Sequence, residues 1–268
     1  MDPQLIQQIT PYEPWLTIIG VLVLFILLRI TRKTLRRRVD QIGYQLMRER
    51  GMLIWFWLNA PGVMVHELSH ALVVLLLRPF GFRITSITLF SIKPMVARGP
   101  NGRIMRSGGR QWLQLGEVQY DRPVGRPITY IGDGISGIAP LFGGTAMFIL
   151  LYWVATGYNL WDATEHLQIL RPGWPWWTLL FAPYLILTVT SELWPSRKDW
   201  EGAFWFVIGM VLLIGAIITA LWYFHQLNAM FSIATLVAQH VDFALLILLA
   251  LDLIFLAIAE LLAHTFWR

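Results

Sequence analysis

The sequence has no cysteine among its 268 residues, and only 14% of them are charged. The lack of thiols excludes disulfide bonds and thiolate metal sites, so any metal must be held by histidine, aspartate or glutamate. There is also no long hydrophilic block that could form an independent soluble domain, and no repeat of solenoid period. These absences leave a chain made almost entirely of apolar segments.

Hydrophobic residues make up 56% of the chain, and the mean hydropathy is +0.57. A helix needs about 20 apolar residues to cross about 30 Å of hydrocarbon. We therefore expect an all-α polytopic membrane protein with about six transmembrane helices. They are predicted near residues 15–30, 52–77, 131–157, 176–194, 201–224 and 242–266. The first should remain as an anchor, because no basic residue precedes it as in a signal peptide.

The largest polar insert, residues 78–130, follows the second predicted helix. It contains FRITSITLFSI and RQWLQLGEVQY, which are rich in β-branched and aromatic residues and partly alternating. This pattern predicts a small β-hairpin or sheet at the membrane surface, with an irregular basic loop as the alternative. The expected organisation is an anchor helix with a basic amphipathic segment (1–50), a core that includes the insert (51–202), and C-terminal transmembrane helices (203–268).

The net charge of +5 comes largely from arginine in RITRKTLRRR and in the loop from Arg78 to Arg126. Basic segments beside membrane spans indicate contact with the anionic surface of a lipid bilayer, so we expect no nucleic-acid partner. The last apolar segment contains Asp252, Glu260 and His264. We expect a structural role for these three, by pairing with a neighbouring helix or reaching the interface, and a functional role is the alternative.

Two histidines and a glutamate interrupt the apolar stretch NAPGVMVHELSHALVVLLL, residues 59–77. An ionisable side chain at the centre of a membrane helix costs about 2.5–3.5 kcal/mol on insertion scales, so it needs a partner or a task. His66 and His70 project from one helix face and can bind one zinc ion, and Glu67 could take a proton from a zinc-bound water. This is metallopeptidase chemistry; the alternative is a hydrogen-bonded polar cluster.

Catalytic zinc has three protein ligands and one open position, so HELSH needs a third ligand. The acidic candidates near span ends are Asp133, Glu192, Asp199 and Glu201. Asp199 follows Pro195, which can bend the chain and turn this carboxylate toward the second span. The alternative is that RKDWE is a polar interfacial loop.

The chain resembles the site-2 proteases, a family of intramembrane zinc metalloproteases. The resemblance lies in APGVMVHELSHA (60–71), the strand-like insert, GDGISGIAPLFGG (132–144) and LWPSRKDWEG (193–202). It implies that His66, His70 and Asp199 hold one Zn²⁺ per chain and that Glu67 is the general base. It also implies a membrane-embedded protein substrate and a multi-pass location in a prokaryotic cell membrane.

The chain departs from the family's second motif in three ways. Glu192 stands where the family has Asn, Trp200 replaces a Gly, and the interval from Pro195 to Asp199 is one residue short. Glu192 is therefore the competing third ligand, or a residue that positions substrate.

A transmembrane substrate must be unwound before it is cut, because its carbonyl groups are hydrogen-bonded within the helix. We expect the region 82–120 to add the substrate as an extra strand, with Thr88, Leu89 and Phe90 in contact with it. The small residues Gly134, Gly137, Gly143 and Gly144 predict close helix packing, with gating as the alternative. The competing function is a catalytically inactive scaffold or chaperone that binds transmembrane segments.

Overall fold

The computed structural model describes residues 13–47, 52–91, 93–94, 97–98, 104–105, 113–114, 116–123, 125–160, 173–224 and 227–266. The first twelve residues of the predicted N-terminal segment lie outside this range. The chain divides into two compact units. Unit 1 comprises residues 1–55, 149–187 and 209–268, and unit 2 comprises residues 56–148 and 188–208.

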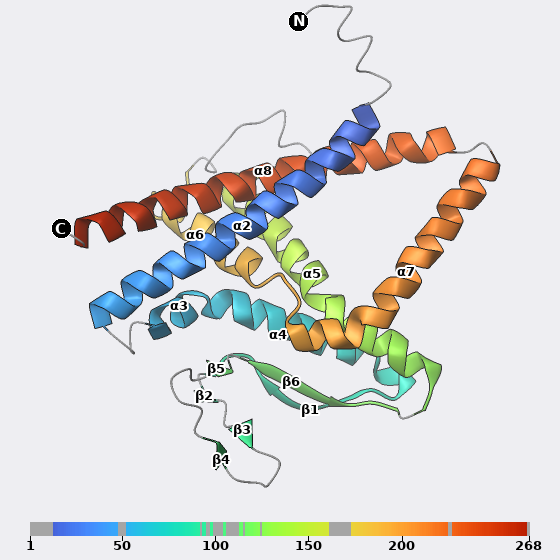
Figure 1. Cartoon of the computed structure of the whole chain (residues 1–268), viewed down its shortest axis with the longest axis horizontal. Helices are drawn as coiled ribbons and strands as arrows, with labels where there is room; N and C mark the ends of the chain where they lie inside the picture. The colour runs from blue at the N-terminus through green and yellow to red at the C-terminus, as the bar shows by residue number, and fades with distance from the viewer. Residues whose placement is uncertain are drawn as a thin grey trace, which may run out of the picture. The chain divides into compact units, whose positions relative to one another are not determined.

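The described chain is mostly helical. Its α-helices are α2 (Glu13–Met47), α3 (Met52–Leu58), α4 (Ala60–Leu76), α5 (Pro127–Thr156), α6 (Thr178–Ser191), α7 (Arg197–Tyr223) and α8 (Leu227–Phe266) (Figure 1). Within the described residues, three segments are long and apolar enough to cross a membrane: Pro127–Thr156, Lys198–Tyr223 and Ala234–Thr265. The second and fourth predicted spans correspond to shorter apolar helices, α4 with 17 residues and α6 with 14. These helices support a membrane protein, and the count of six spans stays a prediction.

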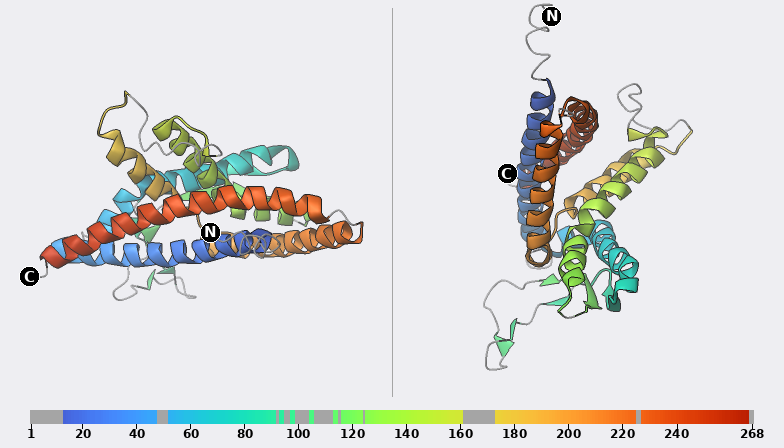
Figure 2. Two further views of the ribbon diagram at one scale, coloured as in Figure 1. Left: turned by 90° about the horizontal axis from the view of Figure 1, so that it is seen from above. Right: turned by 90° about the vertical axis from the view of Figure 1, so that its right-hand side faces the viewer.

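In unit 1, α2 and α8 lie side by side, as both views of Figure 2 show. Gly20 of α2 lies against Asp242 of α8, and further along Arg32 Nε donates to Asp252 Oδ2 at 2.7 Å. Nearer the C-terminal end of both helices, Arg38 Nε donates to Glu260 Oε1 at 2.5 Å. Residue numbers rise together along both helices, so α2 and α8 are parallel.

These ion pairs confirm the expected pairing of Asp252 with a neighbouring helix and give Glu260 a partner as well. They also divide the basic run RITRKTLRRR into two groups. Arg32 and Arg38 face α8, whereas the other basic residues of the run are exposed on α2: Arg29, Lys33, Arg36 and Arg37.

The predicted strands in the insert of unit 2 are confirmed. Strand β1 (Arg83–Thr88) pairs antiparallel with β6 (Glu117–Asp121), with a register shift between Ile84 and Ser86. Between them lie two-residue strands that pair as β2 (Lys93–Pro94) with β5 (Leu113–Gln114) and β3 (Ala97–Arg98) with β4 (Ile104–Met105). The insert is therefore a small antiparallel sheet rather than an irregular loop.

The β1–β6 pair is held against α4 by a short reversal of the chain. A single 3-10 turn, η3 (Arg78–Phe80), follows α4 and ends at Gly81, whose φ of 98° suits glycine. The next residue, Phe82, is fully buried and packs with Val74 and Leu77 of α4. This contact turns β1 back along α4, and β6 follows it (Figure 1).

Small residues bring the helices of unit 2 close together, as the glycine pattern predicts. A Cβ atom added at Gly62 of α4 would lie 2.0 Å from the backbone oxygen of Thr188. One added at Gly143 of α5 would lie 1.9 Å from Ser69 Oγ. These contacts leave no room for a side chain, so tight packing explains both positions.

Candidate metal centre

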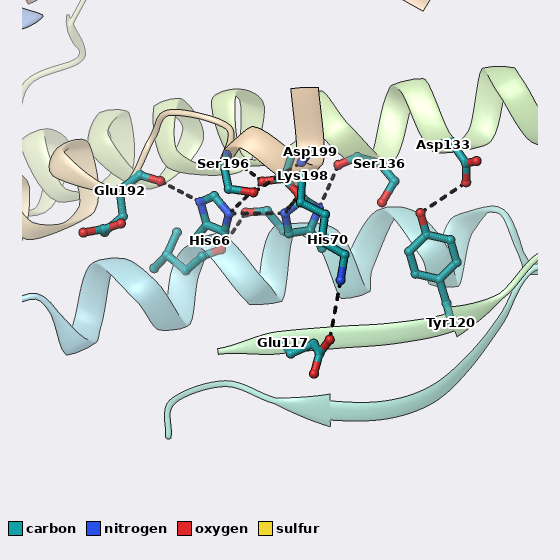
Figure 3. Close-up of polar contacts among 12 residues, drawn as sticks. His66, His70, Glu117, Tyr120, Asp133, Ser136, Glu192, Ser196, Lys198 and Asp199 are labelled. Carbon is teal, nitrogen blue, oxygen red and sulfur yellow. Dashed lines mark hydrogen bonds and ion pairs between the residues drawn. The ribbon is translucent and has the colours of Figure 1, made fainter. Parts of the chain in front are cut away.

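The two histidines of HELSH lie one helical turn apart in α4, and their side chains converge (Figure 3). The Nε2 atoms of His66 and His70 are 3.2 Å apart, and the ring planes meet at 70°. His70 is buried and His66 is half-buried. Pro61 lies in the first turn of α4, where its missing N–H has no helical acceptor to satisfy, so the helix starts without loss before the site.

Asp199 reaches the same point from the first turn of α7. The Ser196 N–H donates to Asp199 Oδ2 at 2.7 Å, and the Asp199 N–H donates to Ser196 Oγ at 3.2 Å. This reciprocal pair is a capping box, which starts the helix and fixes the carboxylate at once. The absence of a side chain at Gly137 of α5 lets the turn pack closely, because a Cβ there would lie 2.5 Å from the Asp199 backbone oxygen.

The three side chains form a compact group with the dimensions of a metal site. Asp199 Oδ2 lies 3.5 Å from His66 Nε2, and Asp199 Oδ1 lies 3.4 Å from His70 Nε2. Tetrahedral ligands about 2.0–2.1 Å from a zinc ion are about 3.3–3.4 Å from one another. The observed separations, including the 3.2 Å between the two Nε2 atoms, match this spacing. Within the described residues, this is the group of histidines and acids that could hold a metal.

Backbone carbonyl groups orient both imidazole rings. His66 Nδ1 donates to the Glu192 oxygen at 2.7 Å, and His70 Nδ1 donates to the Ser136 oxygen at 2.8 Å. A carbonyl oxygen can only accept, so in each neutral ring Nδ1 carries the proton and Nε2 carries the lone pair. Two lone pairs that face each other and a carboxylate repel unless a proton or a metal ion lies between them. Zinc-ligating histidines have this arrangement, with the outer nitrogen bound to a carbonyl or carboxylate.

The other acidic candidates lie elsewhere. Glu192 contributes its backbone oxygen to His66, while its carboxylate points away from both histidines (Figure 3). Asp133 accepts a hydrogen bond from the Tyr120 hydroxyl at 3.2 Å and pairs with Arg122. Glu201 is exposed on α7. Of the four candidates, the structure therefore brings only Asp199 within ligand distance of the histidines.

The sheet is fastened to the elements that carry the site. Burial raises the pKa of the Tyr120 hydroxyl above its ordinary value, and the nearby Asp133 carboxylate raises it further, so Tyr120 stays protonated and can donate to Asp133. At the other end of β6, the Glu117 carboxylate lies 3.5 Å from the Lys198 ammonium group, next to Asp199 (Figure 3). Both ends of β6 are therefore linked to the helices that surround the histidines.

The predicted substrate contacts lie at the end of the sheet nearest the histidines. Thr88 is the last residue of β1 and stands opposite Glu117 in the ladder. Leu89 and Phe90 follow the strand; Leu89 is exposed, and the Phe90 ring lies 5.4 Å from the Trp57 ring. None of these three belongs to the possible metal-binding group.

Sequence reasoning missed several residues that build the site. The capping role of Ser196 could have been found, since S-x-x-D before an apolar run is a capping signature. The carbonyl groups of Ser136 and Glu192 carry no sequence signal, because every residue has one. Gly116 was missed too, although it lies directly against Glu67.

The sequence matches no protein-family model and no curated protein, and the structure matches no solved structure. The functional interpretation therefore depends on the geometry of the site and on its place in an apolar helix.

Proposed function

We propose that this protein is a zinc-dependent intramembrane endopeptidase of the site-2 protease kind, which cuts a transmembrane segment of a membrane-anchored protein. One observation carries the proposal: His66 Nε2, His70 Nε2 and the Asp199 carboxylate converge at 3.2–3.5 Å, and two of them belong to an apolar helix. A zinc ion bound there would activate water and polarise a peptide carbonyl group.

The residues of the chain divide the remaining work. Glu67 precedes His70 by less than one helical turn and acts as the general base that removes a proton from the attacking water. The carbonyl groups of Glu192 and Ser136 hold the two imidazole rings, and the Ser196 capping box holds Asp199. Three protein ligands leave one coordination position for water or substrate, as catalytic zinc requires.

The sheet beside α4 presents the substrate. Among the described residues, β1 and β6 have only each other as strand neighbours, so each has one edge open for pairing. A substrate strand added there would be unwound and extended, with Thr88, Leu89 and Phe90 at the end nearest the histidines. Proline at both Thr88 and Gln119 should abolish cleavage while zinc stays bound. Unchanged cleavage in that variant would refute this mode of substrate binding.

The membrane arrangement follows from α2 and α8. Six alternating crossings would make the first and last helices antiparallel, whereas α2 and α8 run parallel. If both cross, the number of crossings is odd and the two termini lie on opposite sides. One of the shorter helices, α4 or α6, would then enter the membrane without crossing it, since 17 and 14 residues reach only about 26 and 21 Å. Terminal tags probed in sealed vesicles test this: protection of both tags, or of neither, would restore an even count.

The experiment that tests the function measures zinc in detergent-purified protein. The parent chain should bind about one zinc ion. His66→Ala and Asp199→Ala should lose it, whereas Glu192→Ala and Glu67→Gln should keep it. A parent that binds no zinc under metal-replete conditions would refute the proposal.

Cleavage is then measured on a tagged single-span helix with a Gly-Pro pair near its centre, reconstituted in vesicles. A zinc-loaded parent should cut it and Glu67→Gln should not. Zinc binding without cleavage, with this helix still bound, would favour an inactive scaffold.

A further inference from the structure

Gly116 lies directly before β6 and directly against the side chain of Glu67. A Cβ atom added at Gly116 would lie 2.5 Å from Glu67 Cγ and 3.0 Å from both Cδ and Oε1. These three nearest atoms all belong to Glu67 and extend from the middle of its side chain to a carboxylate oxygen. The backbone at residue 116 therefore forms a wall along the proposed general base.

The backbone conformation does not explain the glycine at this position. Among the described glycines, positive φ angles occur at Gly81, Gly125, Gly157 and Gly173. At Gly125 and Gly173, an added Cβ would meet nothing within 4 Å, so conformation is the reason for glycine there. Gly116 shows the opposite combination, because its φ is not positive but the space beside it is filled. Glycine at 116 is required for space, and the occupant of that space is Glu67.

The strand cannot easily withdraw to make room for a larger residue. β6 is paired with β1 along its length, Tyr120 donates to Asp133, and Glu117 pairs with Lys198 (Figure 3). The Glu67 side chain, by contrast, is held by rotatable bonds. A methyl group at 116 would therefore be relieved by movement of Glu67, and the fold would stay intact.

From this contact we infer that Gly116 is a positioning residue, whose bare backbone holds the Glu67 carboxylate in place beside the His66–His70 pair. The inference rests on the proposed function, since it gives Gly116 a role in aiming the general base of that reaction. It adds a requirement that the metal ligands do not contain. Zinc binding and correct placement of the base are separable properties of this site.

The contact itself can be tested without activity or metal, because the chain has no cysteine of its own. The double variant Glu67→Cys/Gly116→Cys should form a disulfide on mild oxidation, since its Cβ atoms would be near the usual separation of about 3.5–4.5 Å. Thiol labelling with a maleimide reagent should then detect almost no free cysteine. The control Glu67→Cys/Gly202→Cys should label fully, because the nearest atoms to a Cβ at Gly202 belong to Asp133. A fully labelled Gly116 pair would overturn the inference.

The role is tested with Gly116→Ala and the matched control Gly202→Ala. Both variants should bind as much zinc as the parent. On the vesicle-reconstituted helix, Gly116→Ala should lower kcat about 100-fold with little change in KM, since a misplacement of about 1 Å can have that effect. Gly202→Ala should keep the parent kcat, because an added Cβ would be 3.7 Å from its nearest neighbour.

A normal kcat in Gly116→Ala would overturn the positioning role, and so would a loss of zinc, which would indicate a structural role. These outcomes differ from a failure of the proposed function. If the parent itself bound no zinc, the protease proposal and the positioning role would both fall, even with a complete disulfide in the cysteine pair.

Discussion

The α2–α8 pair and the start of α7 against α4 place ionisable side chains among apolar helices in two different ways. Asp252, which is 1% exposed, has Arg32 as its partner, and Glu260 has Arg38. Asp199 instead has His66 and His70 as its ion-pair partners in the described structure, and both histidines turn Nε2 toward it. The first region pairs each anion with a permanent cation from the same chain. The second gathers groups that are complete only when a cation is added.

This difference separates structural polar residues from functional ones inside a membrane protein. A buried carboxylate with an arginine partner is already compensated, and its contribution is to fix the helix pair in register. A buried carboxylate that shares two neutral histidines has lone pairs directed at one point, which is the arrangement a divalent metal needs. Perturbing the two regions should therefore have separable consequences.

The largest loss of stability should follow from Asp252→Ala, which leaves Arg32 buried without its carboxylate. Removal of one partner from a buried pair lowers the free energy of unfolding by about 3–5 kcal/mol. Equilibrium unfolding in detergent micelles measures this, and zinc content should stay at the parent value. The double variant Arg32→Met/Asp252→Leu should recover most of the loss, because apolar side chains can replace such a pair. Equal losses in both variants would contradict a compensated pair.

A smaller and ligand-dependent effect should appear at the histidine cluster. Free zinc at a hundred times its dissociation constant should raise the free energy of unfolding by about 2.7 kcal/mol, because it binds only the folded state. The same unfolding experiment, with and without a chelator, measures the increment. His70→Ala should abolish it, and Arg32→Met/Asp252→Leu should retain it in full. A zinc-dependent increment in His70→Ala would show that the metal binds elsewhere.

The sequence predicts some of these features because they are local. HELSH places two histidines on one helix face, and the β-branched residues of FRITSIT indicate the strand that became β1. The choice between Asp199 and Glu192 was not local, since both lie near the end of a span. It depends on the capping box of Ser196 and on the close contact at Gly137, which only the packed chain defines. The parallel direction of α2 and α8 likewise depends on long-range ion pairs that sequence separation conceals.

Ser196→Ala should have an intermediate effect, because it removes one half of the capping box that holds Asp199. The expected loss is about 1 kcal/mol of stability. Zinc affinity should fall about tenfold, as is typical when a partner of a ligand is removed. Competition with a chromogenic chelator measures the affinity. Thr219→Ala is the matched control in α7, since its hydroxyl donates only to the Gly215 oxygen of its own helix. An unchanged affinity in Ser196→Ala would mean that the cap does not orient Asp199.

The smallest effect should come from Glu260→Gln, and it sharpens the comparison within α8 itself. The Arg38 and Glu260 side chains are 33% and 45% exposed, against 13% and 1% for Arg32 and Asp252. Solvent screens the more exposed pair, so its removal should lower the free energy of unfolding by less than about 1 kcal/mol. The unfolding experiment used for Asp252→Ala gives the comparison directly. A loss as large as that of Asp252→Ala would mean that Arg38 and Glu260 are shielded from water, and that the apolar environment extends to the end of the α2–α8 pair.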